Sequence, residues 1–337
     1  IWATRLEEEA VYSSTKPRGG KGGSGSKSKA TINVSYRYFA NVAVGLCEGP
    51  IAFVRRVWAD GKLLDLTSLT MRVHQGGEAQ TADPLIVAKQ GASGAPAYRG
   101  LAYVVFERLP LEDYGNRLPQ LTFEVVRPVH GLCRRIRAIN VIPGAGEHVY
   151  EPAFATSFRG LAFSSLPNRS QLTHATDWHA SIEALQALCP NLEHVALVIA
   201  WFGNDLRAGS CAIRPLTEPG AVDATPYGWS VNGLTRQTAG TMSQVDGKAA
   251  FGGTPSDGSV LRAIHDLKAR GLKVTLYPFV LMDVPSGNTL TDPVTGLPGQ
   301  PAYPWRGRIT CSPAPGRPGT VEGTTGAVTQ VQALFGT

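Results

Sequence analysis

The sequence predicts an α+β chain of two domains, a β-rich part over residues 1–130 and an α/β part over residues 131–337. A length of 337 residues suits two domains of ordinary size. The first part shows long period-two alternation of apolar side chains, which is typical of strands with one buried face. The second part places helical patterns between continuously apolar runs, which is typical of parallel strands joined by helices.

Composition favours a folded protein that is rich in strands and loops. Apolar residues make up 43% of the chain, and 38 glycines and 24 prolines favour turns over long helices. No apolar run reaches the roughly 20 residues that span a bilayer. The chain does not begin with Met and opens inside a predicted strand, so we expect it to be a fragment.

Charge and motifs argue against several function classes. The net charge is +6, and residues 16–29 carry lysines and Arg18 but no acid. We interpret this segment as a solvated loop tip, with contact to an anionic surface or nucleic acid as the alternative. The five cysteines lack zinc spacing, and HExxH, GxSxG and GxGxxG are absent. We therefore predict no metal site, no cofactor and no specific nucleic-acid contact.

The strands of the first part follow from alternation. In "TINVSYRYFANVAVGL" every second residue from Ile32 to Leu46 is apolar or aromatic, which predicts one long strand. Asp60–Gly61 predicts a hairpin turn between apolar flanks. The runs "YVVFERL" and "LPQLTFEVVRPV" predict two more strands. Residues 11–33 form an excursion whose flanking strands we expect to pair as a hairpin arm.

The second part reads strand, helix, strand, helix, strand. The strands are "IRAINVIPGAGE", "HVALVIAWFGND" and "KVTLYPFVLMD", and "GRITCSP" is a weaker fourth. Helical spacing predicts a helix at "DWHASIEALQAL", capped by Thr176 or Asp177, and a second at "SDGSVLRAIHDLKARG", capped by Ser256. Parallel strands joined by right-handed crossovers fit the first part of a (β/α)8 barrel, which we expect to be incomplete in this chain.

Three acidic residues each follow a predicted strand end. Glu147, Asp205 and Asp283 therefore converge on the barrel face where active sites form, and we predict them as catalytic carboxylates. Glycoside hydrolysis needs two such groups about 5–9 Å apart, one protonated and one ionised. The alternative is that each carboxylate caps a helix or ties down a loop. His148 adjoins Glu147 and is the one histidine of interest.

Aromatic and basic residues near the same rim are predicted to bind substrate, because aromatic faces stack on sugar rings and arginines pin carboxylates. These residues are Trp201, Trp229, Tyr303, Trp305, Arg207 and Arg306. The alternative for the aromatic residues is a place in the core or in an interface.

Several long strings together resemble one protein family. They include "YFANVAVGLCEGPI", "WFGNDLRAG", "FGGTPSDGSV", "YPFVLMDVPSGN" and "PAYPWRGRIT", and they extend from about residue 30 to residue 312. The chain resembles the large tail-tip protein of gene transfer agents and related siphophages, which is also described as the baseplate hub, host-specificity or megatron protein.

The resemblance implies a β-rich phage tail hub region, here residues 1–130 and partial, followed by a glycoside-hydrolase-like TIM barrel, here residues 131–337. It implies a place in the virion at the tail tip or baseplate, after synthesis in the bacterial cytoplasm. The implied partners are other tail and baseplate proteins, further copies in a homotrimer, and host surface or wall carbohydrate. The implied role is host attachment and envelope penetration, with an active glycoside hydrolase as the alternative.

Overall fold

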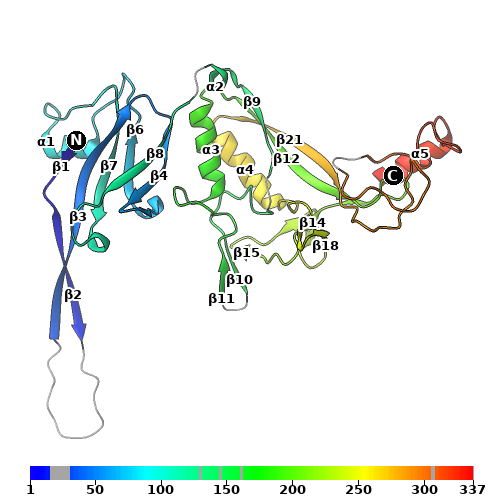
Figure 1. The fold of residues 1–337 in the computed structure, drawn as a ribbon, viewed down its shortest axis with the longest axis horizontal. Helices are drawn as coiled ribbons and strands as arrows, with labels where there is room; N and C mark the ends of the chain where they lie inside the picture. The colour runs from blue at the N-terminus through cyan, green and yellow to red at the C-terminus, as the bar shows by residue number, and fades with distance from the viewer. Residues whose placement is uncertain (16–30, 129–130, 144–145, 160–161, 305–307, 337) are drawn as a thin grey trace, which may run out of the picture. The chain divides into compact units, whose positions relative to one another are not determined.

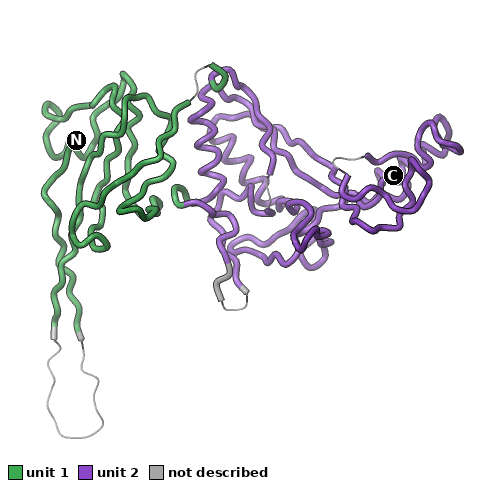
Figure 2. The backbone as a smooth tube through the Cα atoms, viewed as in Figure 1, with its two compact units in different colours: residues 1–133, 172–174 green, residues 134–171, 175–337 purple. Residues whose placement is uncertain are grey.

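The computed structural model describes residues 1–15, 31–128, 131–143, 146–159, 162–304 and 308–336. The chain forms two compact units, shown in Figure 2. Unit 1 comprises residues 1–133 and 172–174, and unit 2 comprises residues 134–171 and 175–337. The division falls three residues after the boundary predicted from the sequence.

Unit 1 consists mainly of antiparallel strands (Figure 1). Its elements are β1 (Trp2–Ala3), β2 (Glu7–Thr15), β3 (Thr31–Glu48), β4 (Phe53–Ala59), β5 (Lys62–Leu63), η1 (Leu66–Ser68), β6 (Thr70–His74), α1 (Pro84–Gln90), β7 (Leu101–Pro110), η2 (Glu112–Tyr114) and β8 (Leu121–Val126), and α2 (Leu132–Arg135) crosses the division between the units.

Two sheets share the main core of unit 1. One sheet has the order β1-β3-β7-β6, with β2 also paired to β3, and the other has the order β5-β4-β8. Buried Val42 and Phe106 from the first sheet pack with Val57 from the second. The predicted hairpin turn between β4 and β5 is confirmed. Asp60 and Gly61 have φ of 47° and 80°, which is the geometry of a type I′ turn.

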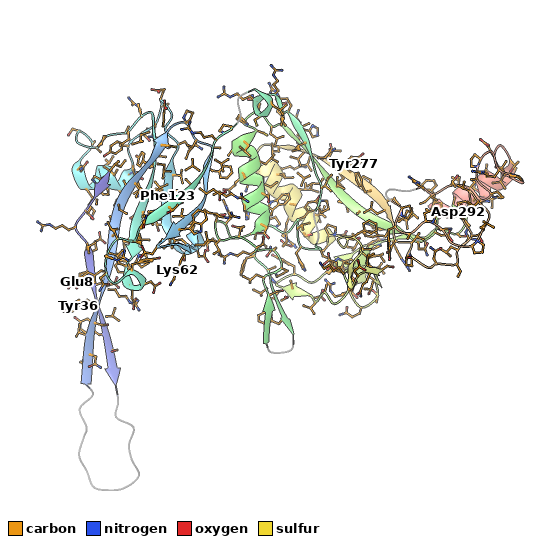
Figure 3. The ribbon with its side chains drawn as sticks, viewed as in Figure 1. Glu8, Tyr36, Lys62, Phe123, Tyr277 and Asp292 are labelled. Atoms are coloured by element: carbon orange, nitrogen blue, oxygen red, sulfur yellow. The ribbon has the colours of Figure 1, made fainter. Side chains whose placement is uncertain are left out.

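Strand β3 confirms the predicted alternation over its second half. Tyr38, Ala40, Val42 and Val44 lie in or against the core cluster of unit 1. Residues 31–38 pair with β2 and with no other described strand, in a ladder that runs from Glu7 opposite Phe39 to Thr15 opposite Thr31, and Figure 3 labels Tyr36 on it. The predicted hairpin arm is therefore confirmed: residues 11–15 and 31–33 of the predicted excursion belong to its ladder, and residues 16–30 lie outside the described part of the chain.

A buried carboxylate joins strand β6 to helix α1. Asp83 is fully buried, and its side chain accepts the backbone N–H of Leu85 as the N-cap of α1. The same carboxylate accepts Nε and Nη2 of Arg72 at 2.7 and 3.0 Å and lies 2.9 Å from Nε2 of His74. Burial alone would raise the pKa of Asp83, but these donors outweigh it and lower the pKa to about 2.

Unit 2 combines long strands, helices and many short strands. Its elements are β9 (Ala138–Val141), β10 (Thr156–Arg159), β11 (Ala162–Ser165), α3 (Asp177–Leu188), β12 (His194–Gly203), β13 (Ile213–Arg214), β14 (Leu216–Thr217), β15 (Ala224–Thr225), β16 (Ser230–Val231), β17 (Leu234–Thr235), β18 (Gly240–Thr241), β19 (Gln244–Val245), β20 (Lys248–Ala249), α4 (Asp257–Ala269), β21 (Lys273–Met282) and α5 (Thr325–Phe335).

The predicted parallel strands and helix caps are confirmed. Strand β12 pairs in parallel with β9 and β21, so that Val195 lies between Ile139 and Val274. Thr176 caps α3 and Ser256 caps α4, each through its side chain. Apolar residues of both helices, including Trp178 and Leu267, pack with β12 in one buried cluster. The segment around Thr310 forms only an isolated bridge with Arg207.

The (β/α)8 barrel stays a prediction. Within the described ranges, the sheet around β12 contains three parallel strands and the short antiparallel β13. Two helices, α3 and α4, separate those three parallel strands in the chain, as a barrel requires. None of the helices in the described ranges is both long and apolar enough to cross a membrane.

Candidate functional site

The predicted acids follow strands whose carboxyl ends point the same way. Strand β12 runs parallel to β9 and β21, and the N–H of Asp283 donates to the carbonyl of Gly203 at 2.8 Å, which extends the β12–β21 ladder. Asp205 lies two residues after Gly203, and Glu147 lies six residues after Val141, where β9 ends. Asp205 and Asp283 thus begin the loops of neighbouring strands.

Glu147 is buried and paired with an arginine of the long loop. Its side chain is 1% exposed, and Arg236 reaches it with two donors, Nη1 to Oε1 at 3.1 Å and Nη2 to Oε2 at 2.5 Å. The backbone N–H of Glu218 donates to Oε1 at 2.6 Å. Gly253 passes so close that an added Cβ would lie 2.6 Å from Cγ of Glu147. Glu147 therefore contacts the loop at three separate points, namely Glu218, Arg236 and Gly253.

Asp205 is held by donors from its own loop and from Gln300. Arg207 donates from its backbone N–H and its guanidinium, with Nη2 at 2.6 Å from Oδ2. Nε2 of Gln300 donates to Oδ1 at 2.7 Å. Burial alone would raise the pKa of Asp205, but these donors outweigh it and lower the pKa. The pairing of Asp205 with Arg207 closes a turn.

Asp283 keeps one oxygen without a donor among the described residues. Its Oδ2 accepts the N–H and the hydroxyl of Ser243, each at 3.2 Å. Its Oδ1 is buried and accepts no hydrogen bond. A buried acceptor without a donor is costly.

The loop between Asp205 and α4 covers the ends of β12 and β21. Leu216 and Met242 from this loop are buried against Ala200, Phe202 and Leu281 from the two strands. The hydroxyl of Thr254 donates to the carbonyl of Ala200 at 2.9 Å. Loop side chains therefore fill the space at these two strand ends, and Glu147, Asp205 and Asp283 each bind a different set of partners.

The predicted substrate-binding residues differ in exposure. Trp229 is 3% exposed, and its indole N–H donates to the carbonyl of Thr254 at 2.7 Å, so it packs inside the unit. Trp201 and Tyr303 are half-buried. Tyr303 lies edge-on to Phe251, with ring centroids 6.2 Å apart. Arg207 binds Asp205. Trp305 and Arg306 lie outside the described residues.

Glu218 is a titratable neighbour of Glu147 that sequence reasoning missed. Burial raises its pKa, and the charge of Glu147 raises it further, although the N–H of Gly253 donates to its carboxylate at 2.9 Å. Burial also lowers the pKa of His148. The turn "TEPG" that contains Glu218 carries no pattern that points to this contact. No group of three or more His, Cys, Asp or Glu within the described ranges suits a metal ion.

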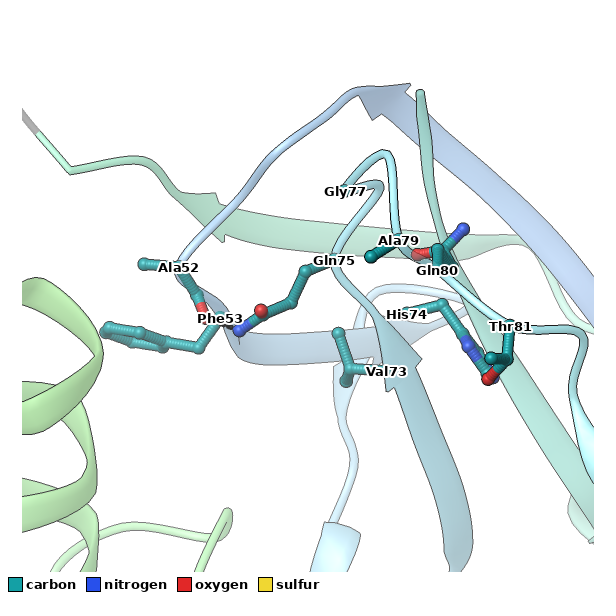
Figure 4. A pocket seen from close by; sticks show the side chains of 9 residues that line it. All are labelled: Ala52, Phe53, Val73, His74, Gln75, Gly77, Ala79, Gln80 and Thr81. Atoms are coloured by element: carbon teal, nitrogen blue, oxygen red, sulfur yellow. Dashed lines mark hydrogen bonds between the residues drawn. The ribbon is translucent and has the colours of Figure 1, made fainter. Parts of the chain in front are cut away.

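Unit 1 contains a pocket of about 490 Å³ at the end of β6 (Figure 4). His74, Gln75 and Gln80 supply its polar groups, and Phe53 and Val73 supply much of its apolar lining. The amide of Gln75 donates to Ala52, and the amide of Gln80 donates to three backbone carbonyls, so both side chains hold the local loops together. None of the predicted site residues lines this pocket.

Comparison with known proteins finds similarity to a chain of a solved structure. No family model matches the chain, and no curated protein matches it. A chain of the solved structure "Virion of native gene transfer agent (GTA) particle" is 56% identical to this chain over the part aligned. The alignment covers 28% of this chain and 22% of that chain, with a TM-score of 0.27. Over that segment the chain is similar to a protein of a gene transfer agent virion.

Proposed function

We propose that this chain is part of a virion structural protein of a phage or gene transfer agent. In this proposal it belongs to the baseplate hub at the tail tip and contributes to host attachment and envelope penetration. Unit 2 binds carbohydrate of the host surface or wall without cleaving it. Its partners are other tail and baseplate proteins and further copies of itself.

Two observations from the sequence support the virion role. The strings that resemble the tail-tip family extend from about residue 30 to residue 312 and so include both units. The part of the chain aligned with a gene transfer agent virion chain is 56% identical to it. The aligned part spans 22% of that virion chain.

The state of Glu147 is the observation that favours binding over hydrolysis. A hydrolase needs two carboxyl groups facing an open space across the sugar bond. Glu147 instead holds two guanidinium donors and a backbone N–H, and loop side chains cover the neighbouring strand ends. Half-buried Phe251 and Tyr303, beside the Asp283 loop, leave partial aromatic faces for a sugar ring.

One observation favours glycoside hydrolysis as the second candidate. Glu218 has a raised pKa and lies beside Glu147, whose charge Arg236 neutralises. Glycoside hydrolysis uses one carboxyl group that holds its proton beside a second one that is ionised. Under this candidate, Glu218 supplies the proton and Arg236 must release Glu147 when substrate binds.

The test measures binding and cleavage separately. The intact protein is incubated with capsule polysaccharide and peptidoglycan fragments, and both pull-down and released reducing ends are quantified. Asp205→Asn, Asp283→Asn and Glu218→Gln are measured beside it. Binding without sugar release supports the proposal. Release that Glu218→Gln abolishes establishes the hydrolase, and absence of both binding and release rejects a carbohydrate role.

A further inference from the structure

The pocket of unit 1 contains a histidine whose orientation is fixed from two sides. Nε2 of His74 lies 2.9 Å from Oδ2 of Asp83, and the imidazole ring stacks on the ring of Tyr103 with centroids 4.2 Å apart. Asp83 is ionised at neutral pH because its pKa is about 2, so its carboxylate can only accept hydrogen bonds. Nε2 of His74 therefore carries a proton, and in the neutral ring Nδ1 keeps a lone pair.

This lone pair is available to a ligand. His74 lines the pocket, its Nδ1 forms no hydrogen bond within the described part of the chain, and that atom is not buried. Thr81 is an exposed residue of the same lining, and its hydroxyl bonds to no described residue. The amide of Gln75 gives one N–H to the carbonyl of Ala52, which leaves the second N–H for a ligand. Three side chains thus present polar groups to one space.

The walls of the pocket are tied in place by the protein itself. Oε1 of Gln80 accepts the N–H of Gly76 at 2.6 Å, and its Nε2 donates to three backbone carbonyls between residues 97 and 101. Gly76 passes so close to β7 that an added Cβ would lie 2.7 Å from the backbone nitrogen of Ala102. A site that is already ordered loses little conformational entropy when a ligand binds.

The lining of the pocket suits a neutral polar ligand. None of the lining residues is Lys, Arg, Asp or Glu. Phe53 and Val73 supply apolar surface, and Figure 4 shows Phe53 at one end of the pocket and Thr81 at the other. The volume of about 490 Å³ is in the range of small-molecule sites. A carboxylate is disfavoured, because neutral His74 offers it a second acceptor and no lysine or arginine of the lining offers it a charge.

We propose that the pocket of unit 1 binds a neutral sugar through His74, Thr81 and Gln75. A sugar carries adjacent hydroxyl groups that donate and accept, so one hydroxyl can donate to Nδ1 of His74 while others bond to Thr81 and Gln75. The apolar face of the sugar ring can pack on Phe53. The choice of a sugar rests on the proposed function, which brings the chain to host carbohydrate. The site shares no residue with the candidate site of unit 2.

The test titrates the full chain with sugars and observes His74 directly. Glucose, galactose, mannose and N-acetylglucosamine are added up to about 100 mM. NMR follows the histidine side chains at about pH 8, where imidazole is ordinarily neutral. The signals of His74 are those that His74→Gln removes. At least one of these sugars should shift Nδ1 of His74 with a Kd of about 10 mM or below.

A pair of valine variants tests the contribution of the hydroxyl. Thr81→Val keeps the shape of the side chain and removes one hydrogen-bonding group, so it should weaken binding by about threefold to tenfold. Thr70→Val is the matched control, because Thr70 is an exposed threonine of β6 that does not line the pocket. It should leave the Kd unchanged. Circular dichroism checks that both variants remain folded.

Several results would overturn the proposal. His74 signals that respond to none of the four sugars reject it, as does an equal Kd in Thr81→Val and Thr70→Val. Glucuronate that binds more tightly than glucose assigns the pocket to an anion instead. Polysaccharide pull-down separates this proposal from the role of unit 2. A chain that is pulled down without a response of His74 rejects only the pocket, and a response without pull-down rejects only the role of unit 2.

Discussion

Unit 1 and unit 2 each contain a buried carboxylate that pairs with an arginine. The two ion pairs differ in the sequence separation of their partners. Asp83 binds Arg72, which lies 11 residues away and one strand earlier. Glu147 binds Arg236, which lies 89 residues away in the loop that covers the strand ends. The buried ion pair of unit 1 therefore stabilises a local strand-to-helix turn. The buried ion pair of unit 2 instead holds a long loop over the strand ends.

The strongest test of this contrast is Glu147→Gln. The change leaves Arg236, whose side chain is 12% exposed, with Asp223 as its remaining ion-pair partner among the described residues. Removing one partner of a buried pair costs about 3–5 kcal/mol of unfolding free energy. Hydrogen exchange should accelerate first in the loop over residues 213–254, and denaturant titration of unit 2 gives the size of the loss.

Glu193→Gln is the matched control for Glu147→Gln. Glu193 forms an exposed ion pair with Arg137, so its removal should cost less than about 1 kcal/mol. A similar, small loss in both variants would show that Glu147 does not hold the loop, and the contrast between the units would fail.

Acid should destabilise unit 1 through Asp83. The pKa of Asp83 is about 2 in the folded protein, and the ordinary value for the group is 3.8. The stability that Asp83 contributes is therefore present above pH 3.8 and disappears as the pH falls through 2. The expected loss is about 2 kcal/mol. Asp83→Asn should lower stability at neutral pH and flatten this part of the pH profile. Glu112→Gln, at an exposed pair with Arg37, should leave the profile unchanged.

Glu218→Gln should have the smallest effect and the opposite sign. The raised pKa of Glu218 means that its protonated form suits the folded state, so wild-type stability falls as the pH rises through the folded pKa. The glutamine variant stays neutral and should gain stability relative to wild type with rising pH, by less than about 1 kcal/mol. Denaturant titrations at pH 4 and at about pH 7 measure this difference, and a gain at low pH would contradict it.

Local patterns in the sequence predicted local structure well. The caps Thr176 and Ser256, the Asp60–Gly61 turn and the parallel direction of β12 and β21 all follow from short-range propensities and apolar runs. The placement of Glu147, Asp205 and Asp283 after strand ends follows for the same reason. These features depend on residues that are close in the chain.

The partners of the predicted acids could not be read from the sequence. The Glu147–Arg236 pair crosses 89 residues, and Glu151 pairs with Arg262 across 111 residues. The burial of Trp229 depends on how the long loop folds back. Alternation also could not separate the covered half of β3 from the exposed half, because Val34 and Val42 belong to one unbroken pattern.

Strand β3 has a mechanical consequence. Its 18 residues would span about 60 Å if fully extended, and they run without a break from the outer rows of the arm into the five-stranded sheet. The β3–β7 register shifts between Ala40 and Val42, where the two strands can bend. A pull on the outer rows is therefore transmitted through the peptide backbone to this point. A force on the arm would therefore be expected to bend β3 near Ala40 and Val42, at the margin of unit 1.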